Sequence, residues 1–250
     1  MRMVAPVSVR YETGCIAEFV TMMTEGEIVG RLAAVRARIV AAAKRGRLSP
    51  QDVRILAVSK AHGAEVVRAA LRAGLTDFGE NYVGEAVAKM DAPRSSGARW
   101  HFIGRLQSNK ARLVAERFDW MHTVIRERDV LRLNARRPAD SPPLNVCIQV
   151  RMQDGDDRPA LPADEAPGLA ALIGAQKRLR LRGLMGMPMP GAPDDAYRRL
   201  RALFDELNGS GLGLDTLSMG MTADLETAVE CGATLVRVGT ALFGPRPRPR

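Results

Sequence analysis

Several short apolar runs in this sequence end at residues that could together hold an anionic aldehyde. One run ends directly before Lys60, whose amine becomes a nucleophile toward carbonyl groups when burial lowers its pKa. Two later runs end near the hydroxyls of Ser218 and Thr240, and near Gly220 and Gly239, where backbone N–H groups can approach an anion closely. A lysine opposite a phosphate-binding site predicts an aldehyde that carries a phosphate. Pyridoxal 5′-phosphate (PLP) is the obvious candidate.

Each of these residues also has an ordinary structural explanation. Most lysines that follow a strand are simply solvated, and hydroxyls and glycines at strand ends are common in turns and helix caps. Thr222 precedes the segment Ala223–Glu226 and is predicted to cap the helix that begins there. If PLP does bind, Arg237, two residues before Gly239, could face the pyridine nitrogen, and its charge would disfavour protonation of that nitrogen.

The scaffold must bring these strand ends together. Short apolar runs alternate with amphipathic segments, which is typical of βα units. After a first helix at Glu25–Arg45, we predict strands at Arg54–Ser59, Thr76–Gly79, Trp100–Gly104, Trp120–Ile125, Asn145–Val150, Arg180–Met187, Thr216–Met219 and Leu235–Gly239. About eight strands separated by helices predict an α/β fold, a single (β/α)8 TIM barrel, whose active sites lie at the carboxyl ends of the strands. An open doubly wound sheet is the alternative, but no GxGxxG motif follows the first strand.

The predicted helices between these strands lie at Ala64–Ala73, Val83–Met90, Ser108–Phe118, Arg128–Arg136, Asp164–Gln176, Asp194–Leu207 and Thr222–Cys231. No linker divides the chain. We predict a poorly ordered N-terminal extension over residues 1–23, one barrel domain over 24–245 and a basic Arg-Pro tail over 246–250.

Composition excludes several classes of protein. The 250 residues include 37 Lys and Arg against 28 Asp and Glu, a net charge of +9, but the arginines are spread beside acidic residues rather than gathered in one stripe. We therefore expect no nucleic-acid partner. No stretch approaches the ~18 apolar residues of a membrane helix, and the N-terminus lacks a signal-peptide pattern. The three cysteines and three histidines show neither CxxC nor HExxH spacing, so we expect a cytoplasmic protein without a metal site.

Six ordered motifs carry a resemblance to a known family. They are Ala57–Lys60, Phe78–Tyr82, Trp100–Gly104 with Leu106–Lys110, Arg182–Met185, Leu217–Met221 and Arg237–Gly244. Together they closely resemble the PLP homeostasis protein family, which is similar to the barrel domain of bacterial alanine racemase. The resemblance covers about residues 25–245.

The resemblance implies a fold-type III PLP-binding barrel that holds PLP as a Schiff base. The residues implied are Lys60 for the Schiff base, Arg237 at the pyridine nitrogen, Asn81 near the ring hydroxyl, and Ser218, Gly239 and Thr240 at the phosphate. Members of the family are regarded as carriers or buffers of PLP in intracellular vitamin B6 balance, without an established reaction. Apo forms of PLP-dependent enzymes are the partners that such a carrier would have.

The alternative is an amino-acid racemase or another weak PLP-dependent enzyme. In the racemase family the second base is a tyrosine supplied across a dimer, with help from a C-terminal β-domain that we do not expect here. Tyr82 lies near the predicted active face, where we expect it to pack rather than act as a base. We therefore expect a monomeric, non-enzymatic protein with no catalytic residues. One departure from the family is Asp156–Ala160, which replaces a Ser/Asn-Lys-x-Gly loop.

Overall fold

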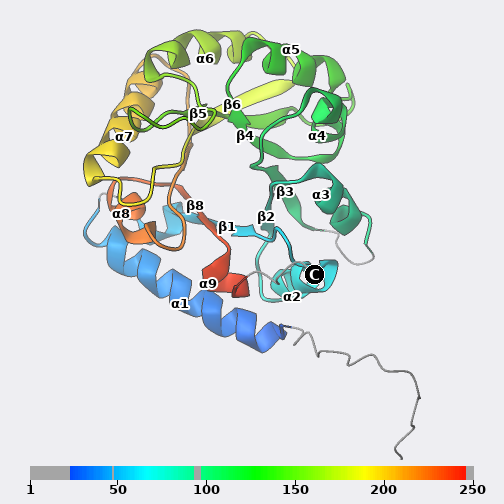
Figure 1. The fold of residues 1–250 in the computed structure, drawn as a ribbon, viewed down its shortest axis with the longest axis vertical. Helices are drawn as coiled ribbons and strands as arrows, with labels where there is room; N and C mark the ends of the chain where they lie inside the picture. The colour runs from blue at the N-terminus through cyan, green and yellow to red at the C-terminus, as the bar shows by residue number, and fades with distance from the viewer. Residues whose placement is uncertain (1–22, 47, 93–96, 246–250) are drawn as a thin grey trace, which may run out of the picture.

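A computed structural model describes residues 23–46, 48–92 and 97–245, and within them eight parallel strands close into a barrel (Figure 1). Each strand pairs with the next, and β8 pairs with β1. The strands are β1 Arg54–Val58, β2 Asp77–Glu80, β3 Arg99–Phe102, β4 Trp120–Val124, β5 Leu144–Val150, β6 Leu179–Gly186, β7 Thr216–Ser218 and β8 Leu235–Val238. The (β/α)8 prediction is confirmed, and every predicted strand is present to within two residues at its ends.

Helices surround the strands. They are α1 Glu25–Ala43, α2 Ala64–Arg72, α3 Val83–Met90, α4 Ala111–Arg117, α5 Glu127–Arg136, α6 Ala166–Gly174, α7 Asp194–Gly209, α8 Leu225–Glu230 and α9 Thr240–Phe243. The prediction of Thr222 as a helix cap is wrong. The chain continues as a loop after β7, and Asp224 occupies the N-cap position of α8. The sequence pattern also did not predict α9, a single turn that follows β8 directly.

The first helix covers one side of the barrel. Thr24 caps α1 through a reciprocal pair of hydrogen bonds with Glu27, and the buried stripe from Ile28 to Ile39 faces the core. The helix packs against α2, α8 and α9 (Figure 1). Met23, which we had assigned to the extension, is partly buried against the core. The predictions for residues 1–22 and for the Arg-Pro tail at 246–250 lie outside the described residues.

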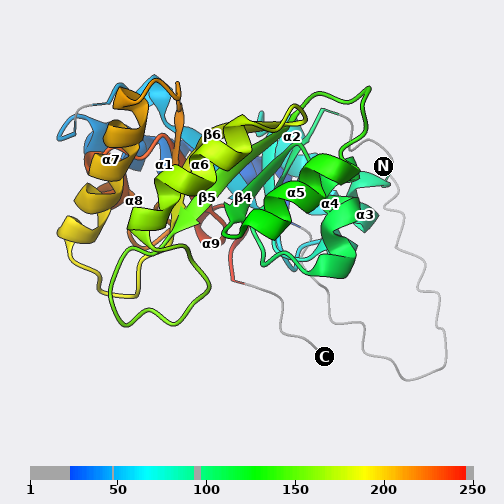
Figure 2. The ribbon, with the colours of Figure 1, turned by 90° about the horizontal axis from the view of Figure 1, so that it is seen from above.

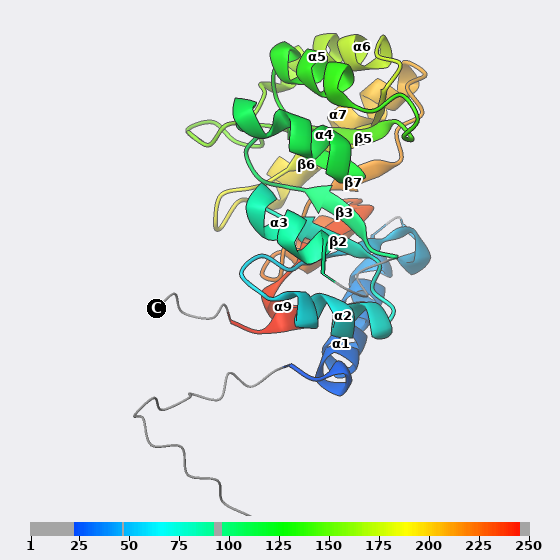
Figure 3. The same ribbon diagram turned by 90° about the vertical axis from the view of Figure 1, so that its right-hand side faces the viewer.

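One end of the barrel carries the longer loops. The loops that follow β5 and β6 project on the same side of the molecule as α9, as the two rotated views agree (Figures 2 and 3). The carboxyl ends of the parallel strands are therefore covered by loops. Across the described ranges, no helix is long and apolar enough to cross a membrane.

Candidate functional site

A cavity of about 270 Å³ lies at the carboxyl ends of the strands. Lys60, two residues beyond β1, lines this cavity with Arg237 from β8 and Asn81 from the end of β2. Gly239 and Thr240 line it at the start of α9. Among the described residues that line it there is no carboxylate, so its two cationic side chains make it suitable for an anion. Of the six residues singled out from the sequence, five meet here.

A buried ion pair supports the strand ends that carry Lys60 and Asn81. Lys89 donates from Nζ to Oε1 of Glu80 at 2.6 Å and to the carbonyl of Ser59 at 2.8 Å. The hydroxyl of Ser59 donates to the same Glu80 oxygen at 2.6 Å. Burial raises the pKa of the Glu80 carboxyl, and the contacts with Lys89 and Ser59 lower it by less. Ser59 precedes Lys60 and Glu80 precedes Asn81, so the pair sets the relative position of the two cavity residues.

The backbone turns sharply at the residue after Lys60. Ala61 has a φ of 65°, which lies in the left-handed region that residues other than glycine rarely adopt. Its N–H donates to the carboxylate of Glu85 on α3 at 3.1 Å. This hydrogen bond connects the loop after β1 to the neighbouring α3 and helps to hold the strained turn in place.

The loop after β7 reaches the first turn of α9 at the cavity. Oγ1 of Thr222 accepts a hydrogen bond from the N–H of Ala241 at 3.4 Å, and Thr222 lines the cavity. Asp224 fixes this loop, because Oδ1 accepts from the N–H of Met221 at 2.8 Å and Oδ2 accepts from the hydroxyl of Tyr197 at 2.6 Å. Thr222 and Thr240 therefore present two hydroxyl-bearing side chains to one region of the cavity.

Ser218 lies elsewhere. Its side chain is 0% exposed and does not line the cavity. Its Oγ lies 3.0 Å from Nδ1 of His122 and accepts a hydrogen bond from Nη1 of Arg237 at 3.1 Å. Sequence reasoning missed Thr222 as a cavity residue because we assigned it to a helix cap. It lies four positions after Ser218, in the loop that follows β7.

Arg237 is held from inside the barrel. Nη1 donates to the carbonyl of Ser218 at 2.7 Å, and Nη2 donates to the carbonyl of Gly186 at 2.9 Å. Burial lowers the pKa of the guanidinium to about 10, so the side chain remains a cation at neutral pH. The cavity thus has a fixed positive group on its inner wall.

Asn81 provides a polar atom that is prepared for a ligand. Its Oδ1 is buried and has no hydrogen-bond partner among the described residues. A buried acceptor without a partner costs free energy, which a bound donor recovers. Asn81 lines the cavity together with Lys60 and Ile103.

Comparisons with known proteins agree with this geometry. The family model described as alanine racemase, N-terminal domain, matches residues 31–247. The pyridoxal phosphate homeostasis protein of Escherichia coli K12 is 46% identical over 230 residues, which cover 88% of this chain and 97% of that protein. Its counterpart in Pseudomonas aeruginosa is 48% identical over 223 residues, which cover 88% and 96%. The chain belongs to the pyridoxal phosphate homeostasis protein family.

Solved structures share the barrel of this family. PipY of Synechococcus elongatus, determined with PLP bound, is 35% identical with a TM-score of 0.71 and covers 87% of this chain and all of PipY (100%). An alanine racemase of Clostridium difficile is 14% identical with a TM-score of 0.71, covering 89% of this chain and 60% of the racemase. At that level of identity the racemase shows a shared fold alone.

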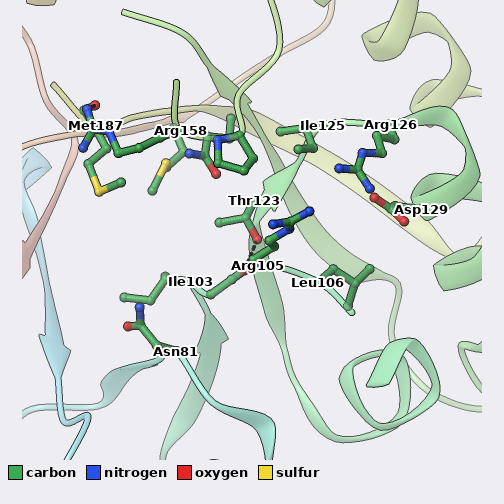
Figure 4. Close-up of a pocket in the computed structure, with 14 residues that line it drawn as sticks. Asn81, Ile103, Arg105, Leu106, Thr123, Ile125, Arg126, Asp129, Arg158 and Met187 are labelled. Atoms are coloured by element: carbon green, nitrogen blue, oxygen red, sulfur yellow. Dashed lines mark hydrogen bonds between the residues drawn. The ribbon is translucent and has the colours of Figure 1, made fainter. Parts of the chain in front are cut away.

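This member of the pyridoxal phosphate homeostasis protein family has a second cavity, of about 250 Å³, beside the first (Figure 4). The two cavities share the wall residues Asn81, Ile103, Met185 and Met187. Arg105, Arg126 and Arg158, from the loops after β3, β4 and β5, also line the second cavity. The mouth of the barrel is therefore wider than the cavity that holds Lys60.

The loop after β5 contains Asp156–Ala160, where the resemblance implies a Ser/Asn-Lys-x-Gly loop. Arg158 makes two hydrogen bonds to the carboxylate of Asp156, at 2.7 and 2.6 Å, and donates to the carbonyl of Met187 at 2.8 Å. The ion pair lowers the pKa of Asp156 and raises that of Arg158. A guanidinium, which cannot form a Schiff base at neutral pH, thus stands in the loop where the resemblance implies a lysine. Within the described ranges, no cluster of His, Cys, Asp or Glu could hold a metal ion.

Proposed function

We propose that this chain binds PLP and acts in PLP homeostasis as a carrier or buffer of the cofactor. The observation that carries the proposal is the meeting of Lys60, Arg237 and the Thr222 and Thr240 hydroxyls in one cavity. Bound PLP supplies an aldehyde that forms a Schiff base with a lysine amine, and a dianionic phosphate. Lys60 is the amine that lines the cavity.

The phosphate group would lie at the loops after β7 and β8. Thr222, Gly239 and Thr240 line the cavity there, and barrel proteins often bind phosphate in these two loops. We therefore assign Thr222, rather than Ser218, to the phosphate. Arg237 would donate to the pyridine nitrogen, and the buried oxygen of Asn81 would accept from the ring hydroxyl.

We infer a non-catalytic role. Racemisation requires a second acid–base group close to the bound substrate. Tyr82 is 64% exposed, and Tyr197 is buried with its hydroxyl donating to Asp224 at 2.6 Å. Of the described tyrosines, neither lines the Lys60 cavity. We expect a monomer whose partners, beyond PLP, are apo forms of PLP-dependent enzymes in the cytoplasm.

Borohydride reduction of the purified protein tests the PLP proposal. Reduction converts a Schiff base into a stable amine, so peptide mass mapping should find a pyridoxyl group on Lys60. The Lys60→Arg variant, which keeps the charge, should fold and carry no adduct there. Lys110 does not line the Lys60 cavity, and Lys110→Arg is the matched control that should keep the adduct on Lys60. A protein with no adduct on Lys60 would overturn the proposal.

Incubation with single L-amino acids tests the non-catalytic role. The protein loaded with PLP should form no D-isomer above the level of the Lys60→Arg variant. Robust formation of a D-amino acid that depends on Lys60 would instead establish a racemase.

A further inference from the structure

A continuous chain of polar contacts crosses the barrel interior and ends at Arg237. Oδ1 of Asp77 on β2 lies 3.0 Å from Nε2 of His101 on β3. Nδ1 of His101 lies 2.9 Å from Nε2 of His122 on β4, and Nδ1 of His122 lies 3.0 Å from Oγ of Ser218 on β7. Both histidines and Ser218 are 0% exposed, and Asp77 and Arg237 are also buried. The five side chains link five strands without a gap.

The carboxylate of Asp77, at one end of this series of contacts, determines which nitrogen of His101 carries the proton. Asp77 accepts hydrogen bonds from Nε and Nη2 of Arg99 at 2.9 and 2.7 Å, and from the hydroxyl of Thr76 at 2.9 Å. Burial raises the pKa of Asp77, but the hydrogen bonds from His101, Arg99 and Thr76 outweigh it and hold the pKa below its usual value. The carboxylate is thus ionised and can only accept. Nε2 of His101 must therefore carry the proton.

The donor of every other hydrogen bond in this series follows from the protonation of Nε2 on His101. A neutral imidazole has one N–H, so Nδ1 of His101 is an acceptor, and Nε2 of His122 must be protonated. Nδ1 of His122 is then an acceptor for the hydroxyl hydrogen of Ser218. The oxygen of Ser218 in turn accepts from Nη1 of Arg237. All the donors point from Arg237 toward Asp77.

Both imidazoles are kept neutral by their surroundings. Burial lowers the pKa of His101 and that of His122, and for His122 the charges of Arg237 and Arg54 act in the same direction. The stacked ring of Trp120 covers His101 at a centroid distance of 5.1 Å and an interplanar angle of 9°. Asp77 and Asp119 oppose these effects at His101, but burial is the largest effect on its pKa.

We propose that Asp77, His101, His122 and Ser218 are positioning residues for Arg237, acting as a one-directional hydrogen-bond relay. This inference rests on the proposed function. The relay, together with the carbonyls of Ser218 and Gly186, holds the guanidinium as a donor that faces the Lys60 cavity. A ring nitrogen that meets this donor must accept and stays unprotonated, which keeps bound PLP a poor electron sink. Such a cofactor is suited to storage.

Stability alone does not explain the relay. Four polar side chains inside an apolar barrel each require a partner, and apolar residues of similar volume often serve a core at least as well. What the polar chain adds is a fixed direction for every hydrogen bond up to Arg237. Loss of one hydrogen bond in the relay would leave the guanidinium of Arg237 less firmly oriented.

The first experiment tests the relay without PLP. The apo protein is labelled with 15N-histidine, and the ring nitrogens of His101 and His122 are assigned by NMR with His101→Gln and His122→Gln variants. Both rings should be neutral with the proton on Nε2. A proton on Nδ1 of either ring, or a doubly protonated ring at neutral pH, would overturn the relay. This result does not depend on whether PLP binds.

The second experiment tests what the relay does to PLP. Ser218→Ala should weaken PLP binding about tenfold, the effect of one lost hydrogen bond to a charged group. It should also move the absorption band of bound PLP toward that of the Arg237→Gln variant. His122→Asn, which keeps an acceptor for Ser218, should retain the wild-type band, whereas His122→Leu should not.

Thr216→Val is the matched control. Thr216 is a buried hydroxyl residue on the same strand as Ser218, and its contacts are with Arg54 and Asp215 rather than with the relay. The Thr216→Val variant should keep the wild-type absorption band of bound PLP and the wild-type affinity for PLP. Wild-type spectra for Ser218→Ala and His122→Leu, in a protein whose Lys60 adduct is intact, would sink the positioning role while leaving the proposed function standing.

Discussion

Nζ of Lys89 lies 2.6 Å from Oε1 of Glu80, and both side chains are buried. Lys89 belongs to α3, whereas Glu80 ends β2 and directly precedes Asn81. The same ammonium holds the carbonyl of Ser59, directly before Lys60, at 2.8 Å. One ion pair therefore links a helix to the two strand ends that carry the proposed Schiff-base lysine and its neighbour.

Removal of Lys89 should be strongly destabilising. Lys89→Met leaves the Glu80 carboxylate buried without its cation, and we expect the free energy of unfolding to fall by about 3–5 kcal/mol. The double variant Glu80→Gln with Lys89→Met removes both charges and should recover much of that loss. Urea unfolding measures all three proteins. Lys177→Met, at an exposed lysine, is the control and should change stability by less than about 0.5 kcal/mol. A double variant that is no more stable than Lys89→Met would contradict the pairing.

The hydroxyl of Thr222 should contribute to PLP affinity. A hydrogen bond to a charged group such as the phosphate contributes about 1.5–3 kcal/mol. Thr222→Val should therefore raise the dissociation constant of PLP by about tenfold or more. Thr222→Ser keeps the hydroxyl and should bind nearly as well as wild type. Absorbance titration with PLP measures both variants. Unchanged affinity in Thr222→Val would remove this residue from the phosphate site.

A methyl group at Gly104 should displace Asn81. A Cβ at this position would stand 2.0 Å from the carbonyl oxygen and 2.8 Å from the carbonyl carbon of Asn81, so the backbone must move. We expect Gly104→Ala to lower the free energy of unfolding by about 1–3 kcal/mol and to weaken PLP binding.

Gly84 provides the matched control for Gly104. A Cβ at Gly84, on α3, would meet nothing within 4 Å. Gly84→Ala should therefore gain about 0.5–1 kcal/mol from helix propensity and leave PLP binding unchanged. Thermal unfolding and PLP titration compare the two variants, and equal behaviour would contradict the steric argument.

Acid should destabilise the protein through Asp77. Its pKa in the folded protein lies below the ordinary 3.8, because hydrogen bonds from His101, Arg99 and Thr76 outweigh burial. Asp77 therefore binds a proton more readily in the unfolded chain than in the folded protein. The ionised Asp77 stabilises the fold at pH values above the ordinary pKa of 3.8, and this stabilisation is lost as the pH falls below that pKa. In the Asp77→Asn variant, the free energy of unfolding should decrease less steeply as the pH falls. Urea unfolding between about pH 6 and pH 3 measures this decrease. A variant with the slope of wild type would show that another group causes the acid loss.

The local pattern of the sequence was sufficient for the order of the strands and of the helices between them, but it did not predict α9. Most strands contain a short run of buried residues, and most helices have an apolar stripe, so residues close in sequence determine both. Lys60 could be placed at the barrel mouth because it directly follows such a run. Arg237, Gly239 and Thr240 stand at the end of another run and line the same cavity.

Only the tertiary structure decided which polar groups meet. His101 and His122 are 21 residues apart, and Ser218 lies 96 residues beyond His122, so closure of the barrel was needed to align them. Thr222, two residues beyond the turn at Gly220 with its φ of 89°, lines the cavity, whereas Ser218 on β7 is buried and does not line it. Periodicity reports which face of an element is buried. Hydrogen bonds between strands far apart in sequence depend on register and closure, which no local pattern contains.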